Sequence, residues 1–282
     1  MEKFGFIGMG NMAKALAAGF IEAGVLKKEQ VFAFAPNQDK LAKNAEKIGF
    51  MAMATLEGVI RNCDVIIMAC KPYQIEGVLK QTADLWNNKV LLSVAAGWDH
   101  ARYTACMKEL GILSEGESAE GTENTPVRLQ FIMPNTPAMV SEGVFLFEEK
   151  TSLTEDELNE TKKMFQTLGT VEVLPSHLMG IGGAISGCGP AFVDLMMEAY
   201  ADAAVKYGIP RDTAYRMVSQ TVLGAAALQQ DTGLHPGVLK DQVCSPGGTT
   251  IRGVAALEEN GFRNACLASI DVIMSAKQNE SK

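Results

Sequence analysis

The sequence has no excess of basic residues, because 25 Lys and Arg stand against 33 Asp and Glu, for a formal net charge of −8. Such a chain offers no positive field to a phosphate backbone, which argues against nucleic acid as a partner. The N-terminus lacks a basic segment followed by an apolar one, and dense apolar runs such as residues 65–70 are too short to span a bilayer. We therefore expect a cytoplasmic protein with a small-molecule ligand and no membrane partner.

Paired cysteines are also missing. None of the six forms a C-x-x-C pair, and all lie scattered through apolar segments. This spacing supports neither a zinc site nor a disulfide framework, so no metal is expected. The sequence predicts buried, reduced thiols at Cys63, Cys70, Cys106, Cys188, Cys244 and Cys266.

The first part of the chain, residues 1–174, alternates short β-rich runs with helical stretches. Several runs are apolar on consecutive residues, as expected where helices cover both faces of a parallel sheet. The sequence thus predicts the α/β fold class, with an N-terminal doubly wound Rossmann domain. The expected strands are residues 3–7, 31–35, 50–54, 64–69, 89–94, 128–133, 144–147 and 170–173.

The second part, residues 175–282, shows no strand pattern and reads as an all-α domain. Its Ala, Gly and Met content permits close helix packing, and its surplus apolar surface suits a subunit interface. Between the expected strands of the first part, the acidic segment 111–127 has no hydrophobic period and is expected to be an exposed loop. The expected helices of the second part are residues 190–207, 211–230, 250–259 and 261–277.

A glycine-rich turn follows the first expected strand and opens the first helix, with the sequence Gly8-Met9-Gly10-Asn11-Met12-Ala13. The first glycine permits a tight turn, the second lets the backbone approach a pyrophosphate, and the small Ala13 permits close packing of strand and helix. At the head of a βαβ series, this pattern predicts dinucleotide binding. The contacts are expected from Ile7, Gly8, Gly10, Asn11 and Met12.

The end of the second expected strand bears on the choice of dinucleotide. An acidic residue there would bind the ribose hydroxyls of NAD, but no acid occurs before Asp39. Without carboxylate repulsion a 2′-phosphate is permitted, although no Arg is present to clamp it. We expect NADPH as the preferred cofactor, with NADH as the other candidate, and contacts from Ala35 and Asn37.

Six motifs, in order, resemble the pyrroline-5-carboxylate reductase family. They are G-F-I-G-M-G-N-M-A at the start, A-C-K-P at 69–72, S-V-A-A-G at 93–97, M-P-N-T-P at 133–137, S-G-C-G-P-A-F at 186–192, and H-P-G-V-L-K-D-Q-V-C-S-P-G-G-T-T-I at 235–251. The resemblance implies NAD(P)H-dependent reduction of 1-pyrroline-5-carboxylate to L-proline, the last step of proline biosynthesis. It also implies a helical C-terminal domain that interlocks with a second subunit, in a homodimer whose dimers often assemble further.

The resemblance assigns roles to particular segments. It implies that the Gly-rich turn, the A-C-K-P segment and the A-A-G segment line the cofactor, and that S-P-G-G-T-T holds the substrate. Ala35 and Leu56 depart from the family, since they stand where its members often have Ser and Asn. The implied cofactor contacts are Ala69, Cys70, Lys71, Pro72, Ala95, Ala96 and Gly97, and the implied substrate contacts are Ser245, Gly247, Gly248, Thr249 and Thr250.

Two of these motifs have alternative readings. Lys71-Pro72 ends an expected strand at the edge where such sheets bind ligands, but an ordinary turn with a solvated lysine would have the same sequence. Asn135 lies in a loop stiffened by two prolines, and its amide is expected near the nicotinamide or the substrate. A turn in which Asn135 bonds to its own backbone is the alternative.

Other chemistries find less support. Ser186 lacks the G-x-S-x-G spacing of a nucleophile elbow, and His235, followed by Pro and Gly, reads as a turn residue. A relative that reduces another imino acid remains an alternative, as does a β-hydroxy acid reductase, for which Lys206 and Lys240 are candidate catalytic lysines. A third alternative is an inactive nucleotide-binding or assembly protein, but the Gly-rich turn and the substrate segment are both intact.

The segment Ser245-Pro246-Gly247-Gly248-Thr249-Thr250 has a chemistry of its own. Its Pro and Gly residues can fold the backbone so that successive N–H groups converge on an anion, and the expected helix that follows adds the positive end of its dipole. A carboxylate suits such a site. Thr250, or otherwise Thr249, is then expected to share a hydrogen bond with the ring nitrogen of the substrate, which makes Thr250 the candidate catalytic residue.

Overall fold

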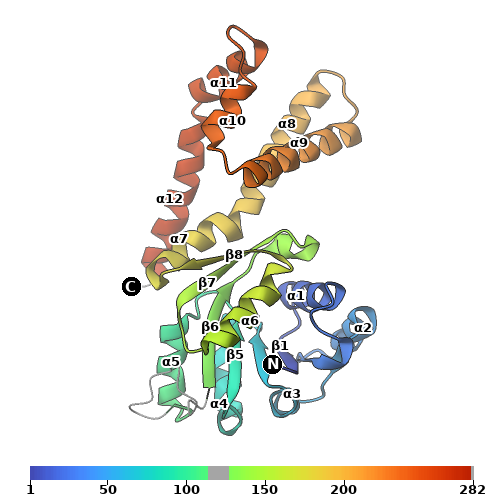
Figure 1. The fold of residues 1–282 in the computed structure, drawn as a ribbon, viewed down its shortest axis with the longest axis vertical. Helices are drawn as coiled ribbons and strands as arrows, with labels where there is room; N and C mark the ends of the chain where they lie inside the picture. The colour runs from blue at the N-terminus through green and yellow to red at the C-terminus, as the bar shows by residue number, and fades with distance from the viewer. Residues whose placement is uncertain (114–126, 281–282) are drawn as a thin grey trace. The chain divides into compact units, whose positions relative to one another are not determined.

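The computed structural model describes residues 1–113 and 127–280. Most of the acidic loop expected at 111–127 lies outside the described residues. Eight strands form one sheet in the order β3-β2-β1-β4-β5-β6-β7-β8, in which every neighbouring pair is parallel except β6 and β7 (Figure 1). The strands are β1 (Phe4–Ile7), β2 (Val31–Phe34), β3 (Met51–Ala52), β4 (Val65–Met68), β5 (Lys89–Ser93), β6 (Val127–Met133), β7 (Gly143–Thr151) and β8 (Gly169–Leu174).

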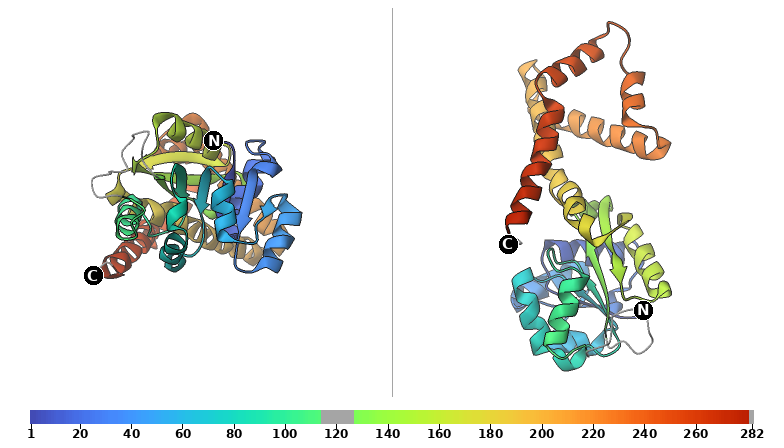
Figure 2. Two further views of the ribbon diagram at one scale, coloured as in Figure 1. Left: turned by 90° about the horizontal axis from the view of Figure 1, so that it is seen from below. Right: turned by 90° about the vertical axis from the view of Figure 1, so that its left-hand side faces the viewer.

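Helices cover both faces of this sheet. One core holds apolar side chains of α1, α2 and α6, and the other holds those of α3, α4 and α5. The right-hand view of Figure 2 shows α5 and α6 on opposite sides of the strands. The helices are α1 (Asn11–Glu22), α2 (Gln38–Ile48), α3 (Leu56–Asn62), α4 (Ile75–Gln81), α5 (His100–Glu109) and α6 (Glu155–Gln166).

The two-sided cover explains the apolar runs in the sequence. Every residue of β1 and of β4 is buried, so their side chains have no solvent face. The predicted doubly wound Rossmann fold is confirmed. The weak strand expected at residues 50–54 is present only as the two-residue β3 at the edge of the sheet.

The chain divides into two compact units, Met1–Gly187 and Cys188–Lys282. The first unit runs past the expected domain end at residue 174, where β8 ends. The extension comprises α7 (Met179–Gly183) and a π-helical turn over Ala184–Cys188, of which Ala184–Gly187 belong to the first unit. Met179 packs with Phe131 and Leu146 of the sheet, and this small apolar cluster explains why α7 belongs to the first unit.

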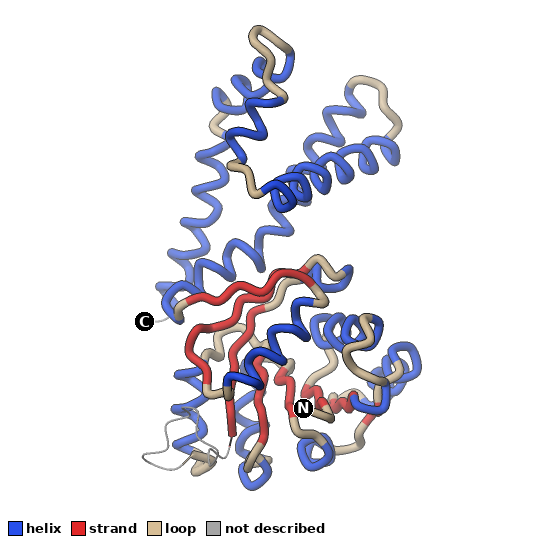
Figure 3. The backbone as a smooth tube through the Cα atoms, viewed as in Figure 1, coloured by secondary structure: helices blue, strands red, loops and turns tan. Residues whose placement is uncertain are grey.

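The second unit contains helices and loops but no strand among its described residues (Figure 3). Within that described part only Ala201 and Ala214 are buried. A single copy of this unit therefore encloses almost no core. Its helices are α8 (Gly189–Lys206), α9 (Arg211–Thr232), α10 (Pro236–Gln242), α11 (Thr249–Glu259) and α12 (Phe262–Glu280).

Candidate active site

The carboxyl ends of β1, β4 and β5 lie side by side, because the three strands are parallel neighbours. The backbone N–H of Ala69 donates to the carbonyl of Ile7 at 2.9 Å, and that of Val94 donates to the carbonyl of Met68 at 3.0 Å. The segments that follow these strands are the Gly-rich turn, residues 69–72 and residues 95–97. The structure thus brings together the three segments expected to line a cofactor. They meet where the strand order reverses, the usual ligand site of such sheets.

The two glycines of the Gly-rich turn have different surroundings. Gly8 has a φ of +92°, and a Cβ there would lie 2.6 Å from the backbone nitrogen of Cys70, so a side chain would be both strained and in collision. Gly10 has open space around its Cβ position. It caps α1 without any side-chain hydrogen bond, and the first turn of α1 carries no acidic residue. The first N–H groups of α1 are therefore open to an anion.

Residues 95–97 are held by side chains behind them. Ala95 is buried, and its backbone N–H lies 3.4 Å from Oγ of Ser93, which donates to the hydroxyl of Tyr103 at 3.0 Å. Nη1 of Arg102 donates to the carbonyl of Gly97 at 2.9 Å. Ser93 belongs to the S-V-A-A-G motif but was given no role from the sequence, and neither Tyr103 nor Arg102 was expected at this place. A polar residue at the end of a buried strand was the available signal for Ser93.

Residues 69–72 leave the sheet as a short turn. Lys71 is exposed, and its backbone N–H donates to Oε1 of Gln74 at 3.1 Å, which closes a 3₁₀ turn over Pro72–Gln74. In the same segment, burial raises the pKa of the Cys70 thiol to about 11. The thiol is therefore uncharged at pH 7 and does not act as a nucleophile.

The end of β2 lies beside the Gly-rich turn, since the N–H of Gly8 donates to the carbonyl of Phe34 at 2.9 Å. The side chain of Asn37 accepts from the N–H of Lys40 at 2.9 Å and so caps α2, while Nε2 of Gln38 donates to the carbonyl of Ala35 at 2.9 Å. The polar side chains at this end thus serve the local fold, and no carboxylate stands in the 35–38 segment.

Asn135 has partners that the sequence did not suggest. Its Nδ2 donates to the carbonyl of Ser186 at 2.9 Å, and its Oδ1 accepts from the N–H of Val144 at 2.8 Å. The residue is 6% exposed. The amide thus joins two distant parts of the first unit, in place of the bond to its own backbone that we considered as the alternative.

The S-P-G-G-T-T segment forms a turn at the start of α11. The N–H of Gly248 donates to the carbonyl of Ser245 at 3.0 Å, and Gly247 has a φ of +70°. The hydroxyl of Ser245 lies over the turn, because a Cβ on Gly248 would lie 2.4 Å from it. Among the described residues no hydrogen bond is recorded for the hydroxyls of Thr249 and Thr250, which occupy the first two positions of α11. The turn therefore presents free hydroxyl and N–H donors.

The remaining candidates lie in structural settings. Oγ of Ser186 donates to the carbonyl of Gly182 at 3.1 Å within the helix, and Nδ1 of His235 accepts from the N–H of Gly237 at 3.0 Å, as expected of a turn residue. Desolvation lowers the pKa of His100 to about 4, so this imidazole is neutral at pH 7. The ammonium of Lys240 pairs with Asp241. No group of three metal-binding side chains occurs within residues 1–113 and 127–280.

The prediction of buried thiols is only partly right. All six cysteines are free, but Cys63 alone is fully buried and Cys266 is exposed. Burial raises the pKa of Cys63 to about 12. The half-buried and exposed cysteines include Cys188, Cys244 and Cys266 of the second unit, which lacks the core that would cover them.

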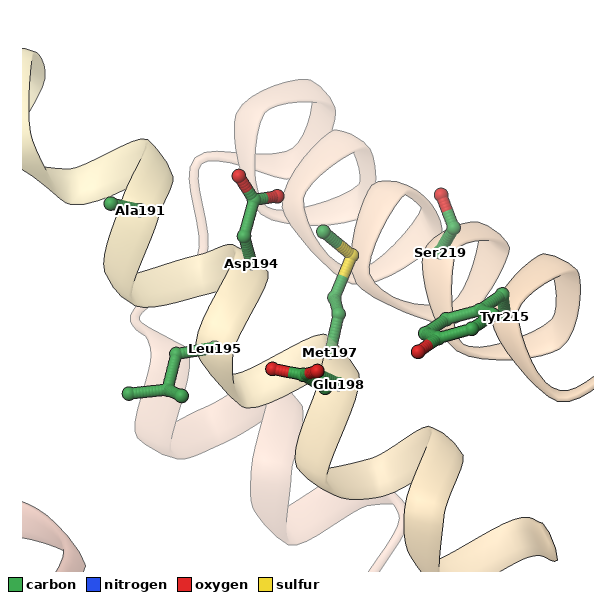
Figure 4. A pocket seen from close by; sticks show the side chains of 7 residues that line it. All are labelled: Ala191, Asp194, Leu195, Met197, Glu198, Tyr215 and Ser219. Atoms are coloured by element: carbon green, nitrogen blue, oxygen red, sulfur yellow. The ribbon is translucent and has the colours of Figure 1, made fainter. Parts of the chain in front are cut away.

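The second unit leaves apolar side chains in solvent. Leu195, Leu267 and Val272 are among those at least 66% exposed. A cavity of about 580 Å³ opens between α8 and α9 (Figure 4). The cavity is lined by Ala191, Asp194, Leu195, Met197, Glu198, Tyr215 and Ser219.

One continuous helical segment, Ser176–Lys206, has the length and composition of a membrane span, and 22% of its apolar window is buried.

Two families match parts of the chain. Residues 176–280 match the family described as pyrroline-5-carboxylate reductase dimerisation, which agrees with the uncovered apolar helices. Residues 3–97 match the family described as NADP oxidoreductase, coenzyme F420-dependent.

Full-length relatives carry one name. The chain is 40% identical over 272 residues to pyrroline-5-carboxylate reductase of Treponema pallidum, covering 96% of this chain and 98% of that protein. It is 36% identical over 282 residues to that of Escherichia coli, covering 100% and 99%. A crystal structure of Plasmodium falciparum pyrroline carboxylate reductase with NADP bound matches with a TM-score of 0.82 at 29% identity, covering 100% of both chains. The enzyme from Coxiella burnetii matches with a TM-score of 0.85 at 28% identity, covering 100% of this chain and 99% of that one.

Proposed function

The chain belongs to the pyrroline-5-carboxylate reductase family, and we propose that it divides the work of the reaction between two segments. The turn from Gly8 to Ala13 holds the cofactor pyrophosphate, and the turn from Ser245 to Thr250 holds the substrate. The reaction is the NADPH-dependent reduction of 1-pyrroline-5-carboxylate to L-proline, the last step of proline biosynthesis. The single observation that carries this division is that each turn leaves backbone N–H donors uncapped at a helix start.

The cofactor segment suits a dinucleotide. NADPH, when bound, supplies the hydride. Gly10 leaves room for a pyrophosphate against the first turn of α1, and Gly8 lets the backbone pass within contact of Cys70. Residues 69–72 and 95–97 stand at the same sheet edge and are the proposed walls for the nicotinamide half. No acid precedes Asp39 at the end of β2, which leaves room for the 2′-phosphate of NADPH.

The substrate segment suits a carboxylate. The N–H groups at the start of α11 and the hydroxyl of Ser245 are donors, and the first turn of α11 has no acidic residue to repel an anion. Thr250 has an unengaged hydroxyl, which can share a hydrogen bond with the ring nitrogen and so fix the orientation of the imine. The nitrogen takes its proton from water or enters already protonated as the iminium.

A homodimer formed through the second unit accounts for its missing core. We propose that these dimers assemble further and that the enzyme works in the cytoplasm, where its free cysteines stay reduced. A second copy, and not lipid, covers the helical segment Ser176–Lys206, because Asp194, Glu198 and Asp202 lie along it.

The substrate assignment is tested by Thr250→Ala. Losing one hydrogen bond to a polar or charged substrate costs about 1.5–3 kcal/mol, so kcat/KM for pyrroline-5-carboxylate should fall about 10- to 150-fold while the KM for NADPH stays near wild type. The matched control is Thr221→Ala, because among the described residues that hydroxyl bonds only to the carbonyl of Met217 in its own helix. Substrate kcat and KM equal to wild type in Thr250→Ala would remove Thr250 from the site.

A further inference from the structure

The chain passes from the first unit to the second through a π-helical turn. Residues Ala184–Cys188 adopt this form between α7 and α8, and the boundary of the two units falls between Gly187 and Cys188. π-helices are rare, occur mostly as single turns within α-helices and are frequent at functional sites, where strained backbone is retained. A turn at this point needs a local reason to persist.

Asn135 supplies that reason. A carbonyl in a π-turn is displaced from its regular helical partner and is open to a side-chain donor. The carbonyl of Ser186 receives such a donor from Nδ2 of Asn135 at 2.9 Å. The other end of the same amide accepts from Val144 of β7 at 2.8 Å, which fixes its orientation. A donor and an acceptor on one short side chain are both required, and asparagine has both.

Asn135 is also tied to the cofactor segment. It occupies the N-cap position of the 3₁₀ turn Thr136–Val140, where its carbonyl accepts from the N–H of Ala138 at 3.3 Å, and this turn packs against α1, the helix that follows the Gly-rich turn. Ala138 of this turn belongs to the same core as Leu16 and Phe20 of α1. The amide of Asn135 thus joins the sheet and the π-turn, and the turn that begins at the same residue packs against α1.

We propose that Asn135 is a positioning residue of the reductase, which holds the Ala184–Cys188 turn in its π form and so sets the phase at which the chain enters the unit carrying the substrate segment. This inference rests on the proposed function. If the turn relaxed to a regular α-helix, one residue would leave the bulge. The residues after it would then rotate by about 100° about the helix axis and shift by about 1.5 Å. Cofactor binding, which uses the first unit alone, would not change.

The test is Asn135→Asp, which keeps the size and the acceptor for Val144 but sets an oxygen against the carbonyl of Ser186. We expect kcat to fall at least 10-fold at pH 8, while the Kd for NADPH, from fluorescence titration, stays within twofold of wild type. A buried carboxyl facing a carbonyl is protonated more readily than in water, and its proton restores the donor. The ratio of variant to wild-type kcat should therefore recover as the pH falls.

Asn135→Ser is the second variant, because it buries no charge and reaches neither partner. It should lose kcat in the same way, without recovery at low pH. The matched control is Asn62→Asp, since Nδ2 of Asn62 also donates to a helix carbonyl, that of Gly58 at 2.7 Å, but on the exposed face of α3. The control should keep the wild-type kcat.

The outcomes separate this inference from the proposed function. A Kd for NADPH that rises in step with the loss of kcat would mean that Asn135 contacts the cofactor, and wild-type kcat in both variants would mean that the contact is idle. Either result overturns the inference and leaves the Thr250 test untouched. Amide hydrogen exchange gives a readout without turnover: residues 184–190 should exchange faster in Asn135→Asp while β1 and β4 stay protected, and unchanged exchange there also overturns it.

Discussion

Gly8 and Gly10 belong to one sequence motif, yet the structure gives them separate tasks. Gly8 makes the fold possible, because its φ of +92° and its contact with Cys70 exclude a side chain. Gly10 leaves space that the fold itself does not use. The motif in the sequence predicts both glycines, but only the geometry separates the one that the fold requires from the one that we propose to serve the ligand.

Two alanine substitutions distinguish these tasks. Gly8→Ala should lose at least about 3 kcal/mol of unfolding free energy, from strain and from overlap with the backbone of Cys70. Gly10→Ala should change stability by less than about 1 kcal/mol, since its φ of −77° suits alanine. Its KM for NADPH should nevertheless rise 10-fold or more, because the methyl group occupies the pyrophosphate space. Urea unfolding and steady-state kinetics measure the two effects, and equal loss of stability in both variants would contradict the assignment.

His100 makes the unfolding free energy of the protein depend on pH. Its pKa is lowered by desolvation from 6.5 to about 4, helped by the charge of Lys150. The unfolded chain therefore binds a proton on this imidazole between pH 6.5 and 4 while the folded chain does not. The stability from this residue is complete above about pH 6.5, and about 3 kcal/mol of it is lost as the pH falls to 4.

The comparison with His100→Gln isolates this term from the titration of carboxylates. Between pH 7.5 and pH 5, urea unfolding should show wild type losing about 2 kcal/mol more than the variant. Parallel losses in the two proteins would show that the folded imidazole takes up its proton as readily as the unfolded one.

Among the helices and strands, the sequence predicts the strands of the sheet but not the long-range hydrogen bonds that hold neighbouring elements in place. Consecutive apolar residues at Phe4–Ile7 and Val65–Met68 predict strands buried on both faces. This prediction needs only a run of neighbouring residues in the sequence. The π-turn at Ala184–Cys188 depends on Asn135, 51 positions earlier, and nothing near Ser186 signals that partner. Long-range polar contacts of this kind require the fold before they can be seen.

Helix α6 is fixed at its start by a network that the sequence shows only in part. Thr154 and Glu157 form a capping box. The carboxylate of Glu157 also accepts from Nε of Arg128 at 2.9 Å and forms an ion pair with its Nη2 at 2.9 Å. Both partners of this ion pair are less than 20% exposed, at 15% and 18%. The acids after Thr154 predicted the helix start, whereas the link to β6 comes from the folded sheet.

Glu157→Ala should therefore cost about 2 kcal/mol, since it removes the pair and half of the capping box together. Glu155→Ala in the same first turn has no such partner among the described residues and should stay within about 0.5 kcal/mol of wild type. Thermal and urea unfolding of both variants check the difference. A similar small effect at both positions would mean that the Arg128 pair contributes nothing to stability.

At the scale of the whole molecule, the two units are stabilised differently. The first buries two cores against its sheet, whereas the second has two buried residues in its described part and leaves Leu267 and Val272 in solvent. The sequence predicted this surplus of apolar surface and a homodimer. The family match over residues 176–280 identifies the unit as a dimerisation domain. The segments proposed to hold the cofactor and the substrate lie in different units, and in the sequence only the resemblance to known reductases links the two.

The most direct test of the proposed reaction is to follow the oxidation of NADPH, and separately of NADH, by the purified protein with 1-pyrroline-5-carboxylate. We expect L-proline in an amount equal to the cofactor oxidised, with the higher kcat/KM for NADPH. No turnover with either cofactor, together with turnover of another imino acid, would contradict the proposed reaction.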